Sequence, residues 1–136
     1  VTDFPNPAVV NMPGALVLPH LGASTEESEE NCAVMAVNQI VDYLENGNIE
    51  NSVNYPSCSL GYRKKAARIC VCHYNRPNVI SQLTSLFGEA GVNISDMVSK
   101  SRGEYAYAMF DVEAPVSDEF EKKLEAMENI IRIRIL

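Results

Sequence analysis

The stretch that decides the fold is RICVCHYNRPNVISQLTSLFGEAGVNI, residues 68–94. It opens on Ile, Val and Cys, which are common in buried strands. Pro77 suits the first turn of a helix, and apolar residues then recur at spacings of three and four until Gly91. The stretch therefore predicts a strand over residues 68–73, a helix after it, and a new strand from residue 92.

The residues that follow continue this alternation. Ser101–Glu104 has turn chemistry, and Tyr105–Val112 has the pattern of a strand. Ser117 can cap a second helix, and residues 131–135 alternate Ile with Arg, as a half-buried strand does. The order βαββαβ predicts an α+β, ferredoxin-like fold with two helices on one face of a four-stranded antiparallel sheet. The other face and the sheet edges need cover, so we expect a homodimer through the sheet.

Charge divides the chain into two parts. Residues 1–60 carry eight acids and no Lys or Arg, whereas the rest carries ten acids and eleven bases, so the parts sum to −8 and +1. Such asymmetry suggests segments of different history. Tyr105, Tyr107 and Met109 share one strand face and could stack on bases, as in RNA-binding folds of this order. The pI of about 4.8 argues against nucleic acid and favours a dimer interface for this face.

The first part of the chain predicts an extended N-terminal segment and a short strand. Residues 1–15 include Pro5, Pro7 and Pro13, and proline fixes φ and lacks an amide donor, so we expect a loop. The apolar run Ala15–Leu18 then predicts a short buried strand.

A long helix is predicted over residues 24–46. Ser24 or Thr25 can cap its start, apolar residues recur at helical spacing along it, and Gly47 can end it. Asn, Ser, Pro and Gly then predict a linker. The expected divisions are 1–23, 24–65 and 66–136.

The motif LPHLGASTEE, residues 18–27, resembles the end of the nucleotide-binding domain of D-2-hydroxyacid dehydrogenases. The resemblance implies that His20 exchanges a proton with the substrate hydroxyl while NAD takes a hydride from the same carbon. Imidazole suits proton exchange near neutral pH. It also implies that His20 and the backbone of Leu21, Gly22 and Ala23 border the cofactor. Taken alone, a histidine before a helix is more often a surface or capping residue.

The same resemblance implies a fragment of a longer enzyme. No Gly-x-Gly-x-x-Gly occurs in the chain, so the cradle for the NAD pyrophosphate is missing. The Arg and Glu that partner the family's histidine are expected upstream of residue 1, which leaves nothing to fix the tautomer of His20. We therefore expect NAD to bind only the intact parent, and no dehydrogenase turnover from residues 1–136 alone.

Two further motifs resemble the ACT domains of phosphoglycerate dehydrogenases. HYNRPNVI, residues 73–80, resembles their His-x-Asn-Arg-Pro-Gly-Val-Leu signature, and GVNI, residues 91–94, resembles a second signature. The resemblance implies an effector site for an amino acid, L-serine in that family, formed by His73, Asn75 and Asn93 between two ACT domains. Asn93 would come from the opposite subunit. Helix amino termini bind carboxylates, and Asn side chains both donate and accept hydrogen bonds, so the residue types suit a zwitterion.

The implied function is the regulatory end of an enzyme that oxidises 3-phosphoglycerate to 3-phosphohydroxypyruvate in serine synthesis. Two observations leave alternatives open. Asn75 and Asn93 could be only cap and turn residues. Asn78 stands where the signature has Gly, which puts serine as the effector in more doubt than an amino acid as such. The alternative function is an ACT module that holds subunits together and binds no ligand.

The four cysteines suggest structural thiols and no metal site. Cys70 and Cys72 face one side of the predicted strand and His73 the other, and no second pair has zinc-like spacing. No apolar run approaches the ~20 residues that cross a bilayer, and no secretory signal opens the chain. We therefore expect a cytoplasmic protein without membrane contact.

Overall fold

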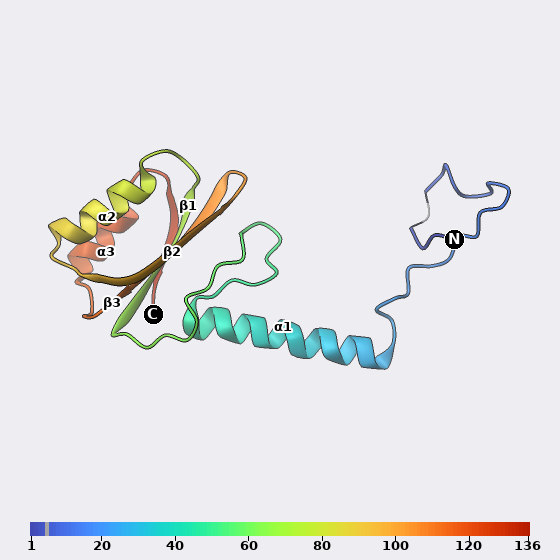
Figure 1. The fold of residues 1–136 in the computed structure, drawn as a ribbon, viewed down its shortest axis with the longest axis horizontal. Coiled ribbons are helices and arrows are strands. Elements are labelled where there is room, and N and C mark those ends of the chain that lie inside the picture. The colour runs from blue at the N-terminus through green and yellow to red at the C-terminus, as the bar shows by residue number, and fades with distance from the viewer. Residues whose placement is uncertain (5) are drawn as a thin grey trace. The chain divides into compact units, whose positions relative to one another are not determined.

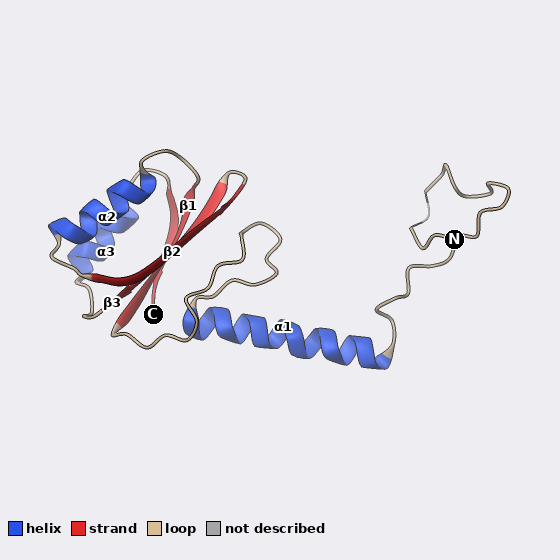
Figure 2. Cartoon of the chain, viewed as in Figure 1, coloured by secondary structure: helices blue, strands red, loops and turns tan. Residues whose placement is uncertain are grey.

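The computed structural model describes residues 1–4 and 6–136, so the loop prediction at Pro5 lies outside the described residues. Helices and strands follow the predicted order βαββαβ after one long helix (Figures 1 and 2). The elements are α1 (Glu26–Asn46), β1 (Ala67–Tyr74), α2 (Val79–Glu89), β2 (Ile94–Arg102), β3 (Tyr105–Val112), α3 (Asp118–Glu125) and β4 (Ile130–Ile135).

The four strands form one antiparallel sheet in the order β2-β3-β1-β4. In the central pair, Ala67 lies opposite Val112 and Tyr74 opposite Tyr105. Both β1 and β2 run antiparallel to β3, so these two strands point the same way. Strands β2 and β4 are the edges of the sheet.

Helices α2 and α3 cover one face of this sheet (Figure 1). The core there joins inward residues of β1 and β3 to the apolar stripes of the two helices. The ring of Phe87 lies 4.9 Å from both Phe110 and Phe120, measured between centroids. Ser117 caps α3 as predicted, because its hydroxyl accepts a hydrogen bond from the amide of Phe120 at 3.2 Å.

The second face of the sheet is covered by the chain itself. Residues 47–61, which we call the cover segment, contribute Ile49, Tyr55, Cys58 and Leu60 to a second core. Tyr107 and Met109 are 1% and 0% exposed within it. The prediction that this face is a dimer interface is therefore wrong for Tyr107 and Met109. Residues predicted only as a linker lie across the face because their apolar side chains find partners there.

Each strand of the sheet also has one side chain that donates hydrogen bonds to backbone carbonyls, either in the cover segment or in the last turn of α1. One donor side chain comes from β1 (Arg68), one from β2 (Arg102), one from β3 (Tyr107) and one from β4 (Arg134). The acceptors and distances are Asn46 at 2.8 Å and Gly61 at 2.7 Å for Arg68, Ser52 at 2.9 Å for Arg102, Gly47 at 2.8 Å for Tyr107, and Tyr43 at 2.8 Å together with Leu44 for Arg134.

The end of α1 is held by these bonds. The last carbonyls of a helix have no partner inside it, and cations near them are favoured by the helix dipole. Arg68 and Arg134 supply such cations, and the guanidinium of Arg134 lies 5.0 Å from the centroid of the Tyr43 ring. The predicted end of the helix is confirmed, with Gly47 at φ +75°.

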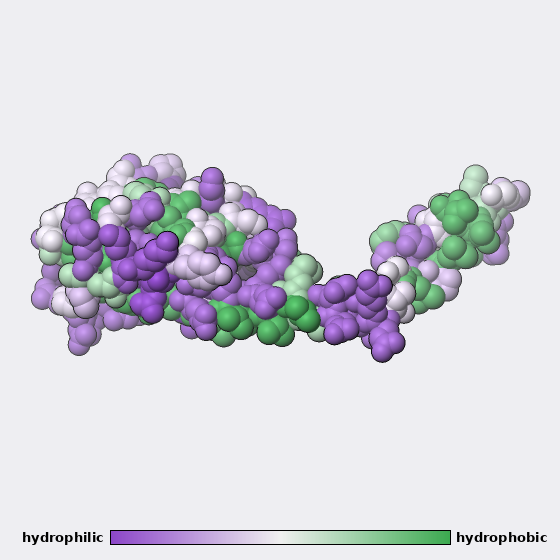
Figure 3. Space-filling view, turned by 60° about the horizontal axis from the view of Figure 1, so that its bottom comes forward, coloured by the Kyte–Doolittle hydropathy of each residue, from purple (hydrophilic) through white to green (hydrophobic). Residues whose placement is uncertain are grey.

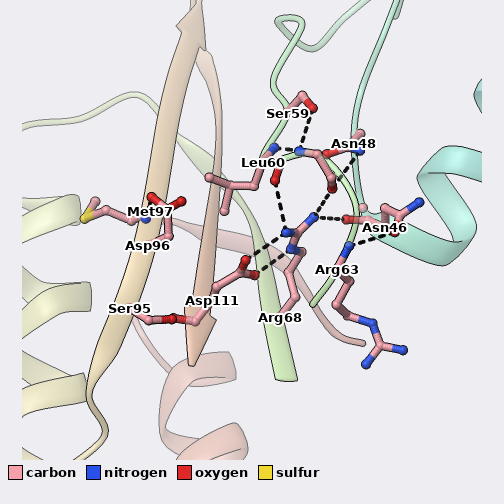
Figure 4. A network of polar contacts seen from close by, with 12 residues as sticks. Asn46, Asn48, Ser59, Leu60, Arg63, Arg68, Ser95, Asp96, Met97 and Asp111 are labelled. Carbon is pink, nitrogen blue, oxygen red and sulfur yellow. Dashed lines mark hydrogen bonds and ion pairs between the residues drawn. The ribbon is translucent and has the colours of Figure 1, made fainter. Parts of the chain in front are cut away.

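Arg68 is fully buried and forms an ion pair with Asp111, Nε to Oδ1 at 2.6 Å and Nη2 to Oδ2 at 2.8 Å. Hydrogen bonding to Asp111 raises the pKa of the Arg68 guanidinium, so the group stays charged. Near it, Asn48 accepts a hydrogen bond from the amide of Leu60 (Figure 4). The side chain of Asn48 also donates to Asp42.

The thiols of Cys58 and Cys70 belong to the second core. Burial raises the pKa of Cys58 to about 11 and also raises that of Cys70, so both remain protonated at neutral pH. This confirms the prediction of a buried structural thiol at Cys70. In the described ranges, 1–4 and 6–136, no group of three or more His, Cys, Asp or Glu could hold a metal ion.

The described residues form two compact units, Val1–Asn38 and Gln39–Leu136. In the first unit the predicted strand at Ala15–Leu18 is wrong, because only one bridge forms, between Thr2 and Val17. A single partner leaves Leu16 and Leu18 exposed. No helix in the described ranges is long and apolar enough to cross a membrane.

Helix α1 carries an exposed apolar stripe (Figure 3). Val34, Val37, Ile40 and Leu44 are each exposed by more than half. The start of α1 is capped by Thr25, whose hydroxyl accepts a hydrogen bond from the amide of Ser28 at 3.2 Å.

We predict that the exposed apolar stripe of α1 pairs with a second copy of the chain or that the helix frays.

Substitution of Gly47 tests how closely the cover segment approaches the sheet. A Cβ there would lie 2.5 Å from Cys70 Sγ, and φ is +75°, so both space and backbone require glycine. Gly47→Ala should lower the free energy of unfolding by about 2–4 kcal/mol, measured by urea denaturation. Gly61→Ala is the matched control, because φ is +67° and nothing lies within 4 Å. Equal losses in both variants would contradict the close approach.

Candidate functional site

His73 is the best-defined member of the predicted effector site. It lies near the end of β1 and is 2% exposed. Its Nδ1 lies 2.8 Å from the carbonyl oxygen of Tyr74, which can only accept, so Nδ1 is the donor. The buried Nε2 has no hydrogen-bond partner in the chain. An unpaired buried polar atom costs roughly 1–3 kcal/mol, and Nε2 is such an unused acceptor inside the fold.

Asn75 lies beside His73 on the loop that leads into α2. Its amide donates to the carbonyl of Glu104 at 2.8 Å, and its side-chain nitrogen donates to the carbonyl of Gly103 at 3.1 Å. Arg76 also approaches Glu104, at 3.9 Å. The loop is thus held against the turn between β2 and β3, which fixes where α2 begins.

Asn78 precedes α2 in the left-handed conformation, with φ 67°. Glycine adopts this conformation freely and Asn tolerates it better than most residues, which explains how Asn78 replaces the Gly of the signature. Its side chain makes no capping hydrogen bond. The amides of the first turn of α2 are therefore not satisfied by this side chain, and such amides favour a carboxylate.

Asn93 lies at the opposite end of the sheet. It precedes Ile94, which pairs with Val112, and Val112 pairs with the first residue of β1. His73 is six residues further along β1, which puts the two ends ~20 Å apart. The structure therefore brings together His73 and Asn75, and it does not bring Asn93 to them within one chain.

His20, the predicted catalytic residue, lies in the first compact unit. Its Nδ1 is 2.7 Å from Asp3 Oδ2, and its ring centroid is 4.4 Å from that of Phe4. The expectation that nothing in this chain fixes the imidazole is therefore wrong. Sequence reasoning missed Asp3 because the pair is 17 residues apart and no motif includes the acid.

The predicted cofactor contacts follow His20 directly. Leu21, Gly22 and Ala23 form an exposed turn, in which the amide of Ser24 donates to the carbonyl of Leu21 at 3.0 Å. A turn of this kind offers one wall to a flat ring and no cradle for a pyrophosphate. These residues alone do not fit a whole dinucleotide, and their role with NAD remains a prediction for the intact parent.

Comparison with known proteins shows where the chain belongs. A model of the ACT domain matches residues 68–132. D-3-phosphoglycerate dehydrogenase of Escherichia coli K12 is 36% identical over 124 residues, 89% of this chain and 30% of that protein. The enzyme of the same name from Haemophilus influenzae is 32% identical over 89% of this chain and 30% of that protein. The one from Dictyostelium discoideum is 32% identical over 91% of this chain and 30% of that protein.

The chain thus spans about 30% of the length of these relatives. Among solved structures, the ACT domain of GTP pyrophosphokinase from Chlorobium tepidum aligns with a TM-score of 0.46 at 15% identity, over 52% of this chain and 95% of that one. The match to the family model identifies residues 68–132 as an ACT domain, in a chain that matches the C-terminal part of D-3-phosphoglycerate dehydrogenases over most of its length.

Proposed function

We propose that the ACT domain binds a small amino acid, L-serine in the first instance, and thereby regulates a D-3-phosphoglycerate dehydrogenase. The observation that carries the proposal is the buried, unpartnered Nε2 of His73, six residues before the first residue of α2. The names of the relatives and the regulatory character of ACT domains support it. The domain division at residues 23 and 65 is proposed together with this function.

The chemistry of the site matches a zwitterion. The first-turn amides of α2 suit the carboxylate, because they are unpaired donors at the positive end of the helix dipole. His73 Nε2 accepts, so it suits the ammonium or the hydroxyl of serine. The carboxamide of Asn75 can complete the shell from the same loop.

Asn93 reaches such a site only from a second copy. We propose a homodimer with two-fold symmetry, in which the end of β1 in one copy faces the start of β2 in the other. Two-fold symmetry then creates two equivalent sites, each with His73 and Asn75 from one copy and Asn93 from its partner. Effector binding would in this way strengthen the interface.

For the intact parent we propose NAD-dependent oxidation of 3-phosphoglycerate, with His20 as the proton acceptor. NAD bound in the intact parent would supply the hydride acceptor, and this chain would contribute His20 and the turn after it. Residues 1–136 alone should produce no NADH, followed by absorbance at 340 nm with 3-phosphoglycerate and NAD. Measurable turnover would overturn this part of the proposal.

Mixed dimers test the proposed sharing of residues. Asn75→Ala and Asn93→Ala should each weaken serine binding by at least about tenfold, measured by isothermal titration, because each removes a hydrogen-bonding group from both sites. In a mixed dimer one site loses both residues and the other is intact. An equal mixture, after exchange of subunits, should therefore recover about a quarter of the wild-type binding capacity.

Asn38→Ala is the control, because Asn38 is an exposed amide on α1 far along the chain from the site. Failure of mixing to recover any binding, with each variant folded, would place Asn75 and Asn93 in one chain's site and contradict the dimer. Absence of binding for every amino acid in the wild type would favour the alternative, a module that only joins subunits.

Two substitutions at Asn78 distinguish the backbone conformation that this position needs from a contact between its side chain and the effector. Asn78→Gly should leave the free energy of unfolding within about 0.5 kcal/mol of wild type, whereas Asn78→Ala should lower it by about 1 kcal/mol, because alanine resists positive φ. Serine affinity of Asn78→Gly should equal or exceed that of wild type in titration. A weaker affinity would mean that the Asn side chain itself contacts the effector.

A further inference from the structure

We propose that the chain between α1 and β1 is a rigid clasp without a hinge, so that the last two turns of α1 move as one body with the ACT domain. By clasp we mean the cover segment together with the side chains that fix it and the end of α1 to the sheet. The proposal rests in part on the regulatory function given above, because a change at the effector site would reach α1 through this body. A segment rich in Asn, Ser, Pro and Gly is ordinarily expected to be flexible.

Both ends of the cover segment are fixed to one buried side chain. Nη1 of Arg68 donates to the carbonyl of Asn46 at 2.8 Å and to that of Gly61 at 2.7 Å (Figure 4). The residue before the cover segment and the last residue of the segment therefore share one donor atom. The guanidinium also bonds to the carboxylate of Asp111 on β3, through Nε and Nη2. The two central strands of the sheet thus hold the ends of the segment together.

The middle of the cover segment is closed on itself and lies against the sheet. Ile49 and Cys58 exchange two backbone hydrogen bonds, at 2.8 and 2.9 Å, in a single antiparallel bridge. Between them, the ring of Tyr55 lies 5.8 Å from that of Tyr105 and 6.3 Å from that of Tyr107, measured between centroids. Mobile loops have few buried apolar contacts and many exposed backbone hydrogen bonds. The cover segment has buried contacts and a paired backbone, so it is a part of the fold.

The end of α1 is held by two further strands. Arg134 of β4 donates to the carbonyl of Tyr43 at 2.8 Å and to that of Leu44. The hydroxyl of Tyr107 on β3 donates to the carbonyl of Gly47 at 2.8 Å. These carbonyls have no partner within the helix, so the sheet supplies their donors. The compact unit that contains the sheet accordingly begins about two turns before α1 ends.

Strand β1 joins the clasp to the proposed effector site. Arg68 lies near the start of β1 and His73 near its end, about 17 Å further along an extended strand. The strand lies between β3 and β4, and Ile69–His73 pair with both neighbours. A strand bonded on both sides cannot bend or slide alone. A displacement of its end on effector binding would therefore move the clasp and the end of α1 with it.

Residual dipolar couplings of backbone amides test the clasp on residues 1–136, without any effector. One alignment tensor fitted to the amides of the sheet, α2 and α3 should also reproduce the couplings of Tyr43–Gly47 and of the cover segment, because all of them report on one rigid body. Couplings of Tyr43–Gly47 that are scaled toward zero, or that need a second tensor, would reveal a hinge and overturn the proposal.

Two double variants with the same chemical changes test the donors of the clasp. Arg134→Gln with Tyr107→Phe removes the donors to the end of α1 and should reduce the couplings of Tyr43–Gly47 at least about twofold relative to those of the sheet. Arg132→Gln with Tyr105→Phe is the control, because each site lies two residues away on the same strand, and the couplings should stay as in wild type. Unchanged couplings of α2 and α3 show that a variant is folded. Equal behaviour of the two variants would overturn the clasp.

Inhibition of the intact parent by serine separates the clasp from the function on which transmission rests. In residues 1–136 the first double variant should bind serine within about twofold of wild type in titration, because it keeps every residue of the proposed effector site. In the parent it should reduce the fraction of activity that saturating serine inhibits at least about twofold, measured as NADH formation, whereas the control variant should not.

Equal inhibition of the parent with and without the two donors would overturn transmission through α1. A wild-type chain that binds no amino acid would instead overturn the proposed effector site, and transmission with it. The dipolar couplings decide the clasp in either case, because they are measured without effector.

Discussion

The ion pair between Arg68 and Asp111 is the interaction on which the rest of the structure depends. Its guanidinium is fully buried, and its donors reach the Asp111 carboxylate and the carbonyls of Asn46 and Gly61. Loss of one partner of a buried pair leaves an uncompensated charge, which costs about 3–5 kcal/mol. The pair therefore joins three things at once: the central strands, the end of α1 and the end of the cover segment.

Closure of the second face limits how two copies of the chain can meet. Tyr107 and Met109 are already buried by residues of the same chain, so the edges β2 and β4, the outer sides of α2 and α3 and the exposed stripe of α1 remain for contacts. The proposed effector site agrees with this limit, because His73 and Asn93 lie at opposite ends of the sheet. Sheet topology, more than any single side chain, is the reason that the proposed site needs two chains.

Sequence alone predicted the elements of the ACT domain well, since each has its own periodicity and its own terminating residue. Tyr105–Val112 is a strand with the predicted bounds, and Ser117 caps α3. Pairings between distant residues could not be predicted in the same way. The cover segment has the composition of a loop, and composition does not say which carbonyls accept from Arg68 or Arg134. The Asp3–His20 contact was hidden for the same reason.

The cover segment changes what counts as a transferable module. The family match begins at Arg68, yet the residues that seal the sheet behind it begin at Gly47, and the compact unit begins at Gln39. A chimeric enzyme joined at residue 68 would receive a sheet with Tyr107 and Met109 bare and with Arg68 facing solvent. A graft joined ahead of Gln39 includes the cover segment, so the unit that folds together is longer than the stretch that the family model matches.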